Sequence, residues 1–332
     1  MTILNKLKST IWASYKAKLQ ESQIQKELEY YQQRAVELKI DIKEITRPDY
    51  LKRKLQDRLK SRNIQKKQKG DLHVLYITPY DYWERINIPP ALEKFGKLST
   101  FYMQDYGFNV LEHDYLKDWL DKRHTFDKKI FEFVSQLHTK EPIDIIVSYV
   151  SGWHIAPETI HKINSLGILT TAFWLDDKLK FRGRIAEGRY EGTASLASAY
   201  DLNLTSSSSS IVKYFIEGGL AMFWPESANP DIFKPLNFPF KYDVSFIGAK
   251  YGKRPEYIKY LKENEIDVHA FGFGWNEGGI KSEEMIKIYS QSKINLGFGG
   301  IGYSMNATCL KGRDFEVPMC GSVYITSHDE DL

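Results

Sequence analysis

A short polar cluster near the end of the chain has the side chains needed to hold a phosphate and a sugar diol. Lys311, Arg313 and Glu316 stand at the approach to a predicted short helix at 310–319, which ends at Gly321. Free N–H groups at a helix start favour an anion, and Arg can grip a phosphate with two parallel hydrogen bonds. A carboxylate such as Glu316 can accept two hydrogen bonds from a ribose diol. The pattern is typical of a nucleotide site or, alternatively, of a surface salt-bridge cluster.

Polar side chains also follow two apolar stretches in the first half of the chain. Asp176 and Asp177 come directly after "ILTTAFWL", and His154 follows "IDIIVSYV". An Asp or a His at the end of a strand can serve as the general base that takes a proton from an acceptor hydroxyl. A helix cap for the Asp pair, and a polar loop for the His, are the alternatives. Adjacent carboxylates in extended chain point in different directions, so we predict no metal site here.

A third polar group follows the first predicted strand, "LHVLYIT". It contains Tyr80, Asp81 and Arg85, with Glu84 between them. In open parallel sheets, ligands bind outside the carboxyl ends of the strands. We therefore expect these residues to bind an acceptor molecule.

The elements that must position these residues alternate between strand and helix. Short apolar runs separated by amphipathic stretches indicate a parallel sheet with helices on both faces. In the first half, strands are predicted at 72–78, 97–103, 143–150, 168–175, 200–205 and 221–225, and helices at 87–96, 115–138, 156–167, 186–199 and 206–218.

The alternation stops between Pro225 and Pro239 and then restarts. The second half has predicted strands at 243–248, 267–272, 293–298 and 322–326, and helices at 254–264, 282–291 and 310–319. We predict an α/β fold of two facing Rossmann-like domains with an N-terminal helical arm. The expected boundaries are 1–68 for the arm, 71–224 for the first domain, 225–241 for the linker and 242–332 for a second, incomplete domain.

The N-terminal arm is basic and carries a heptad pattern. Residues 1–70 hold 18 Lys and Arg against 8 Asp and Glu, a charge of +10, so the other 262 residues carry −7 of the net +3. A basic arm can approach an anionic membrane surface. The arm has apolar residues spaced alternately by four and three: Ile24, Leu28, Tyr31, Ala35, Leu38, Ile42 and Ile45. This spacing predicts either a coiled-coil homodimer or packing against the body, with Pro48 ending the helix.

Composition excludes several classes of protein. Two cysteines cannot form a disulfide framework or a four-ligand zinc site. No apolar run is long enough for a transmembrane helix, and lysines interrupt any signal-peptide core. The chain lacks a P-loop motif. We expect a cytoplasmic protein, either free or bound as a peripheral protein at the inner membrane face, with no nucleic-acid partner.

Several segments resemble GT-B glycosyltransferases. "GRDFEVPMCGSVYIT", preceded by "DVSFIGAKYGKRPEYIKYL" and "VHAFGFGW", is similar to the nucleotide-binding domain of the spore-maturation-type family, with its "KGRxFEvPxCG" pattern. "SYVSGWHIAPETIHKINSLGILTTAFWLDD" resembles the acceptor-side domain of that family. "GGLAMFWPESANPDIFKP" resembles the interdomain passage of family 4 transferases. The resemblance covers roughly 72–332 and leaves out the arm.

The resemblance implies roles for residues of the second domain. Glu316 matches the glutamate on the donor ribose, and Gly248 matches the glycine that ends the first strand. Lys250 or Arg254 matches the cation on the diphosphate. The glycines expected to let the backbone approach the donor closely are Gly299, Gly300 and Gly302.

One position departs from the family pattern. Family 4 enzymes usually carry a second glutamate eight residues before the first, and this chain has Thr308 there. The resemblance implies transfer of a sugar from a nucleotide-sugar donor to a glycan, lipid or protein, with no cofactor and no required metal. A non-catalytic scaffold on a degenerate GT-B fold and a nucleotide-sugar epimerase are the alternatives.

Overall fold

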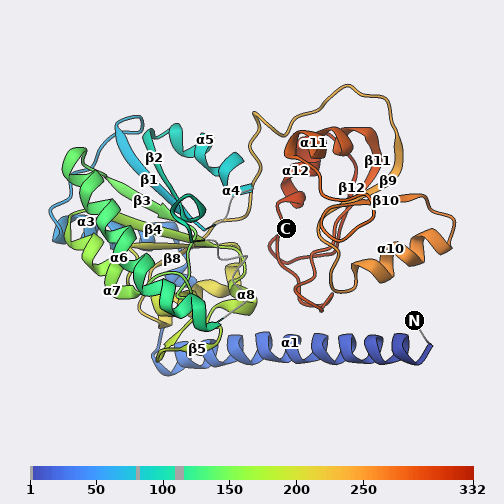
Figure 1. Ribbon diagram of the computed structural model, residues 1–332. Coiled ribbons are helices and arrows are strands. Elements are labelled where there is room, and N and C mark those ends of the chain that lie inside the picture. The colour runs from blue at the N-terminus through green and yellow to red at the C-terminus, as the bar shows by residue number, and fades with distance from the viewer. Residues whose placement is uncertain (1–2, 80–82, 109–115) are drawn as a thin grey trace. The chain divides into compact units, whose positions relative to one another are not determined.

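The computed structural model describes residues 3–79, 83–108 and 116–332, which divide into two compact units (Figure 1). One unit is Leu28–Trp224. The other joins Met1–Glu27 to Pro225–Leu332. Helix α1 (Ile3–Glu37) contributes residues to both units.

The Leu28–Trp224 unit is built on a parallel sheet. Its strands pair in the order β2-β1-β3-β4-β7-β8, a six-stranded sheet among the residues that the structure describes. Val74 of β1 aligns with Ile145 of β3, which aligns with Leu169 of β4. The strands are β1 (Leu72–Thr78), β2 (Gly96–Tyr102), β3 (Ile145–Ser148), β4 (Leu169–Trp174), β7 (Leu202–Thr205) and β8 (Ala221–Phe223).

Helices cover this sheet because its strands are apolar on both faces, as is usual for parallel sheets. Phe126 and Ile130 of α6 pack in one cluster with Leu75 of β1 and Ile160 of α7, and Figure 1 shows α6 and α7 side by side. The helical elements of the unit are α2 (Ile42–Ile45), α3 (Pro48–Ser61), α4 (Trp83–Ile86), α5 (Ile88–Glu93), η1 (Met103–Tyr106), α6 (Leu116–Lys140), α7 (Pro157–Ser165), α8 (Asp177–Lys180), η2 (Thr193–Leu196), η3 (Ser208–Ser210) and α9 (Ile211–Ile216).

The predicted helix at 186–199 is wrong. The segment forms a hairpin of β5 (Ile185–Ala186) and β6 (Arg189–Tyr190), followed by the single turn η2. Glu187 and Gly188 both have positive φ, 51° and 77°, which is the backbone geometry of the favoured two-residue hairpin turn. The local turn therefore prevails over the apolar spacing that suggested a helix.

The second unit also contains a parallel sheet. Its described strands pair in the order β10-β9-β11-β12, and Val244 of β9 aligns with both Val268 and Ile294. The strands are β9 (Tyr242–Ile247), β10 (Val268–Phe271), β11 (Ser292–Leu296) and β12 (Tyr324–Ile325), and the helices α10 (Arg254–Glu263), α11 (Ser282–Gln291) and α12 (Arg313–Met319). The alternation predicted from the sequence is confirmed, although α12 starts at Arg313 and is only seven residues long.

The basic arm is helical, but its helix ends earlier than predicted. α1 stops at Glu37, and Lys39 has a left-handed φ of 54°. Pro48 does not end a helix, as the sequence suggested, but stands at the first position of α3. Its fixed φ and missing N–H suit that position, where no intrahelical bond is lost.

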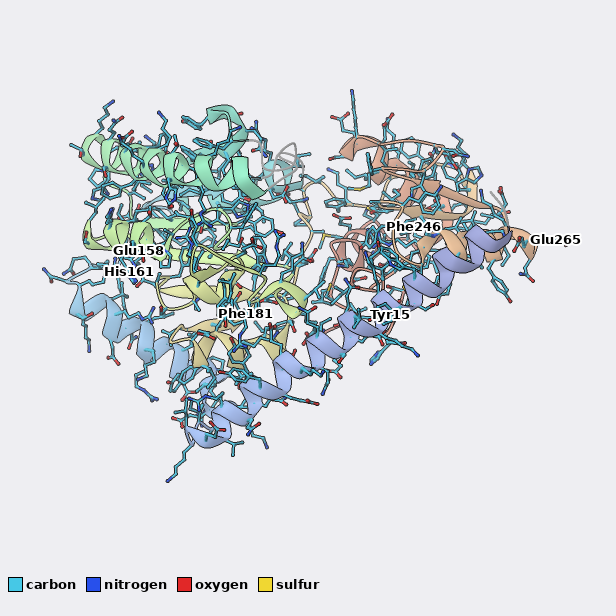
Figure 2. All side chains as sticks on the ribbon, turned by 60° about the horizontal axis from the view of Figure 1, so that its bottom comes forward. Tyr15, Glu158, His161, Phe181, Phe246 and Glu265 are labelled. Atoms are coloured by element: carbon cyan, nitrogen blue, oxygen red, sulfur yellow. The ribbon has the colours of Figure 1, made fainter. Side chains whose placement is uncertain are left out.

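Part of the heptad pattern packs inside the Leu28–Trp224 unit. Tyr31 and Ala35 are buried in a cluster with Phe181, and the rings of Tyr31 and Phe181 meet edge to face at 5.5 Å. Figure 2 labels Phe181 in this region. Leu38 and Ile42 are exposed. Packing against the body is thus the arrangement found for this stretch, while dimerisation and membrane contact stay predictions. No helix in the described residues is long and apolar enough to cross a membrane.

Candidate functional site

The carboxyl edge of the β9–β12 sheet brings Arg313 against the end of β9. β9 ends at Ile247, and Gly248 follows it. A Cβ atom at Gly248 would lie 3.0 Å from Nη1 of Arg313 and 2.9 Å from Cζ of Phe246. Figure 2 labels Phe246 within this unit. Only glycine leaves room for the guanidinium at this place, so the two predicted donor-site residues depend on each other.

Arg313 is a buried cation: burial lowers its pKa, but nearby groups that include Glu316 and Asp314 outweigh this effect. No ion pair joins its guanidinium to a described residue, and within the same residues its Nε and Nη2 have no hydrogen-bond partner although both are hidden from solvent. The guanidinium lies 5.3 Å from the centre of the Phe246 ring. Buried N–H groups of a cation without acceptors are unfavourable. A bound anion could supply the missing acceptors.

Arg254 places a second guanidinium near the same ring. It is 4% exposed and lies 5.5 Å from the Phe246 ring centre. Its Nη1 donates to the carbonyl of Ala249 at 3.0 Å and its Nη2 to the Tyr251 hydroxyl at 2.8 Å. Burial lowers its pKa to about 10; Tyr251 opposes that decrease and the charge of Arg313 adds to it. It is still charged at neutral pH, so two like charges share a poorly solvated site.

The two predicted lysines differ in their surroundings. Lys250 is exposed, with its Nζ 5.2 Å from the centre of the Trp275 ring. Trp275 packs against the core and donates from Nε1 to the Gly248 carbonyl at 2.8 Å. Lys311 donates from Nζ to Sγ of Cys309 at 2.8 Å. Of the two, Lys250 has its ammonium at the surface, where it can meet a ligand.

Glu316 is buried at the start of α12. Its Oε2 accepts a hydrogen bond from the Tyr289 hydroxyl at 3.1 Å. A Cβ atom at Gly312 would lie 3.0 Å from Oε1 of Glu316 and 3.5 Å from Oε2 of Glu226. Two buried carboxylates therefore flank one glycine. The sequence did not point to Glu226, because it stands in the aperiodic stretch that reads only as a linker.

Two of the three predicted glycines in the loop after β11 are required by the protein's own packing. A Cβ atom at Gly300 would lie 2.3 Å from the Ser304 carbonyl oxygen, and one at Gly302 would lie 2.6 Å from the side-chain amide of Gln20. Gly299 has only ordinary contacts, at 3.6 Å. A close approach of this loop's backbone to the donor therefore stays a prediction, and it is not needed to explain Gly300 or Gly302.

In the other unit, Asp177 is held by internal hydrogen bonds. It is 1% exposed, and its Oδ2 accepts from the Tyr214 hydroxyl at 3.1 Å, while Lys213 Nζ donates to its carbonyl oxygen at 3.1 Å. Burial raises the pKa of Asp177 to about 6, against the opposing effects of Thr205, Lys213 and Tyr214. Above that pH it is a carboxylate that can accept a proton.

His154 is also buried, at the carboxyl end of the neighbouring strand. Its Nδ1 accepts from the backbone N–H of Ser151 at 3.0 Å, and its ring centre lies 6.3 Å from that of Trp174. Burial lowers its pKa to about 3. The ring is therefore neutral at neutral pH, with the proton on Nε2 because Nδ1 acts as an acceptor.

The remaining predicted residues of this edge are more open. Asp176 precedes α8 and is half-buried. Arg85 Nη2 donates to Oδ1 of Asp105 at 2.7 Å, and its guanidinium lies 3.9 Å from the centre of the Tyr102 ring. Tyr80 and Asp81 lie outside the described residues. The structure thus brings His154 close to the end of β4, whereas Arg85 of α4 pairs with Asp105 of η1.

Comparisons with known proteins bear on the C-terminal unit. Residues 254–332 match the family described as "Glycosyl transferase-like". The matched residues form part of a parallel α/β sheet of the Rossmann-like kind. No curated protein matches the sequence.

One solved structure with some similarity is a Listeria monocytogenes protein described as a UDP-N-acetylglucosamine 2-epimerase. The two chains are 10% identical, with a TM-score of 0.45, over 78% of this chain and 80% of that one. At this level of similarity we draw no conclusion from it about activity.

The segment that matches the family contains most of the predicted donor residues. Arg254, Lys311, Arg313 and Glu316 all fall inside the matched segment, whereas Gly248 and Lys250 precede it. Thr308, at the position of the second family 4 glutamate, donates from Oγ1 to the carbonyl of His328 at 3.3 Å. In the described residues no three His, Cys, Asp or Glu side chains form a group suited to a metal ion.

Proposed function

We propose that this protein transfers a sugar from a nucleotide-sugar donor to an acceptor, with the donor at the carboxyl edge of the β9–β12 sheet. The observation that carries the proposal is the pair of buried guanidiniums of Arg313 and Arg254 beside Gly248, neither of them in an ion pair with a described residue. A diphosphate supplies two charges and several acceptor oxygens, and Arg binds such oxygens with two parallel hydrogen bonds.

Each donor residue has a distinct role in this proposal. Arg313, with its unpartnered N–H groups, holds the diphosphate, and Arg254 adds charge while it fixes the loop after β9. Lys250 reaches the phosphates from the surface. Glu316 accepts hydrogen bonds from the ribose hydroxyls through the oxygen that faces Gly312.

The chemistry follows from these charges. When the sugar leaves, negative charge grows on the departing diphosphate, and fixed cations in a poorly solvated site stabilise it more strongly than water does. We infer that these cations stabilise the negative charge on the departing diphosphate, as a metal ion would otherwise do. Removal of divalent ions with EDTA should then leave the rate of transfer unchanged.

The acceptor hydroxyl needs a base in the Leu28–Trp224 unit. Asp177 is ionised above a pH of about 6 and can accept a proton. His154, with a pKa of about 3, is a poor base, and we assign it to positioning the end of β4. Asp176, half-buried beside Asp177, and Arg85 are proposed to contact the acceptor, together with Tyr80 and Asp81.

A donor-turnover assay tests the function. The full chain is incubated with a panel of nucleotide sugars, with and without candidate glycan and lipid acceptors, and products are identified by mass spectrometry. We expect nucleoside diphosphate release that an acceptor accelerates, and its loss in Arg313→Ala but not in the surface control Lys259→Ala. Interconversion of the donor sugar without an acceptor would show an epimerase instead. Absence of any donor turnover would favour a scaffold.

A further inference from the structure

A cavity of about 620 Å³ lies in the same unit but is lined by none of the candidate donor residues. One wall is α1, one is α10, and the third is the loop that follows the glycines after β11. Figure 1 shows α1 and α10 close together, and Tyr15, labelled in Figure 2, marks the stretch of α1 concerned. The lining side chains are Ser14, Ala17, Lys18, Glu21, Lys253, Glu256, Tyr257, Tyr260, Tyr303, Met305 and Asn306.

Hydrogen bonds fix the α1 wall to the loop. Gln20 Oε1 accepts from the backbone N–H of Tyr303 at 2.9 Å, and Glu21 Oε1 accepts from Asn306 Nδ2 at 3.1 Å. Glu21 also accepts from the Ser304 hydroxyl. Gly302 has no room for a Cβ atom because Gln20 lies against it. This part of the basic arm is therefore fixed in place as one wall of the cavity, and it belongs to the same compact unit as Pro225–Leu332.

Three tyrosines give the cavity its character. Tyr257 and Tyr260 stand three positions apart on α10, so their rings are neighbours on one helix face. The two residues are 45% and 64% exposed, whereas aromatic side chains in folded proteins are usually buried. Tyr303, on the loop, is the third. Tyr257 and Tyr260 each offer an apolar face with a hydroxyl at the ring edge. The Tyr303 ring already contacts Trp12 edge to face and has Lys16 Nζ 5.0 Å from its centre.

The charges of the lining cancel. Two lysines, Lys18 and Lys253, face two glutamates, Glu21 and Glu256. Lys253 Nζ pairs with Glu256 Oε2 at 3.0 Å, and Glu21 accepts hydrogen bonds from the loop. The donor edge differs, since Arg313 and Arg254 form no ion pair with a described carboxylate. The cavity thus suits a neutral ligand with many hydroxyl groups.

We propose that this cavity binds a neutral saccharide of one or two pyranose rings. A pyranose has a C–H face that packs on aromatic rings and hydroxyl edges that bond to carboxylate, amide and phenol groups. All of these groups line the cavity, and its volume is within the range typical of small-molecule sites, about 300–1,000 Å³. The proposal goes beyond sugar transfer, because binding here requires neither the donor nor Arg313.

Saturation-transfer NMR on the full chain tests the proposal. The probes are the methyl glycosides of glucose, galactose, mannose and N-acetylglucosamine at millimolar concentration. We expect saturation of the ring C–H protons of at least one probe. Tyr260→Ala should weaken that binding about tenfold, as expected for the loss of one aromatic contact. Tyr15→Ala is the matched control, because Tyr15 is an exposed tyrosine of α1 outside the lining.

Three results would overturn the proposal. One is the absence of saturation with every probe. Another is binding that Tyr260→Ala leaves intact or that Tyr15→Ala weakens equally. The third is displacement of the saccharide by a nucleoside diphosphate, which would place it at the donor edge. Failure here leaves the donor site untouched, since nucleotide binding depends on Arg313 and is measured separately.

Discussion

Both sheets place charged side chains at the carboxyl ends of their strands, but these side chains are in opposite electrostatic situations. Beside β9, Arg313 and Arg254 are cations with no ion pair to a described residue, and Arg313 has buried N–H groups without acceptors. Beside β4, Asp177 is a single carboxyl group that receives a hydrogen bond from Tyr214 and has the ammonium of Lys213 nearby.

This difference separates an edge with buried cations from an edge with a buried, partly hydrogen-bonded carboxyl group. Missing acceptors around buried cations raise the free energy of the empty site, and an anion can remove that cost. Oδ2 of Asp177 already has the Tyr214 hydroxyl as its partner, whereas the buried Oδ1 has no hydrogen-bond partner among the described residues. We infer that affinity is concentrated at the β9–β12 edge and that the other edge contributes orientation and proton transfer.

The largest expected effect is on stability at the edge that contains Asp177. The folded-state pKa of Asp177, about 6, lies above the unfolded value of about 3.9. Its stabilising contribution is therefore complete below about pH 4 and is lost as the pH rises through about 6. The loss amounts to about 3 kcal/mol of unfolding free energy.

Asp177→Asn removes this titration and can keep the contact with Tyr214. The unfolding free energy of the variant minus that of wild type should be larger at pH 7.5 than at pH 4, as measured by urea denaturation at both pH values. Equal pH dependence in the two proteins would mean that Asp177 titrates normally and that the contrast between the edges is smaller than described.

The next effect concerns the room for Arg313. Gly248→Ala places a methyl group 3.0 Å from Nη1 of Arg313 and should displace the guanidinium, at a cost of about 1–3 kcal/mol. Nucleoside diphosphate affinity should fall by about that amount in calorimetry. Gly279→Ala is the control, since no atom lies within 4 Å of its Cβ position. Equal affinity in both variants would remove Arg313 from the site.

Glu316 should contribute about 1 kcal/mol to the binding free energy of a nucleoside diphosphate through hydrogen bonds with the ribose hydroxyls. Wild type should bind a ribonucleoside diphosphate more tightly than its 2′-deoxy form, and Glu316→Gln should reduce that preference. The exposed Glu283→Gln is the matched control. A deoxy preference unchanged by Glu316→Gln would assign the residue to structure through its bond with Tyr289.

The smallest effect is expected for Arg85, an exposed cation of the six-stranded edge. Its ion pair with Asp105, 2.7 Å long, is solvent-accessible on both sides, and such pairs contribute about 0–1 kcal/mol. Arg85→Ala should change the unfolding free energy by no more than that and should leave nucleotide affinity unaltered. A loss of nucleotide binding equal to that of an Arg313 variant would contradict the assignment of affinity to one edge.

The sequence predicted the sheets well because their strands are short apolar runs bounded by turns, and burial on both faces of a parallel sheet requires such runs. It also pointed to Arg313 and Glu316, which stand three positions apart in one motif and whose role in a donor site stays a prediction. It could not find Glu226, since nothing in the linker indicates that the chain returns to Gly312. The hairpin at Glu187 and the early end of α1 were missed because local left-handed residues decided them.

Isothermal calorimetry of the full chain with nucleoside diphosphates tests the central claim most directly. We expect at least one of UDP, GDP, ADP, CDP and dTDP to bind, and Arg313→Ala to weaken it about 100-fold, or about 2.7 kcal/mol, as for the loss of a charge-assisted pair of hydrogen bonds. The control Lys259→Ala should bind as wild type does. Binding of none of the five, or equal affinity in Arg313→Ala, would contradict a diphosphate site at the β9–β12 edge.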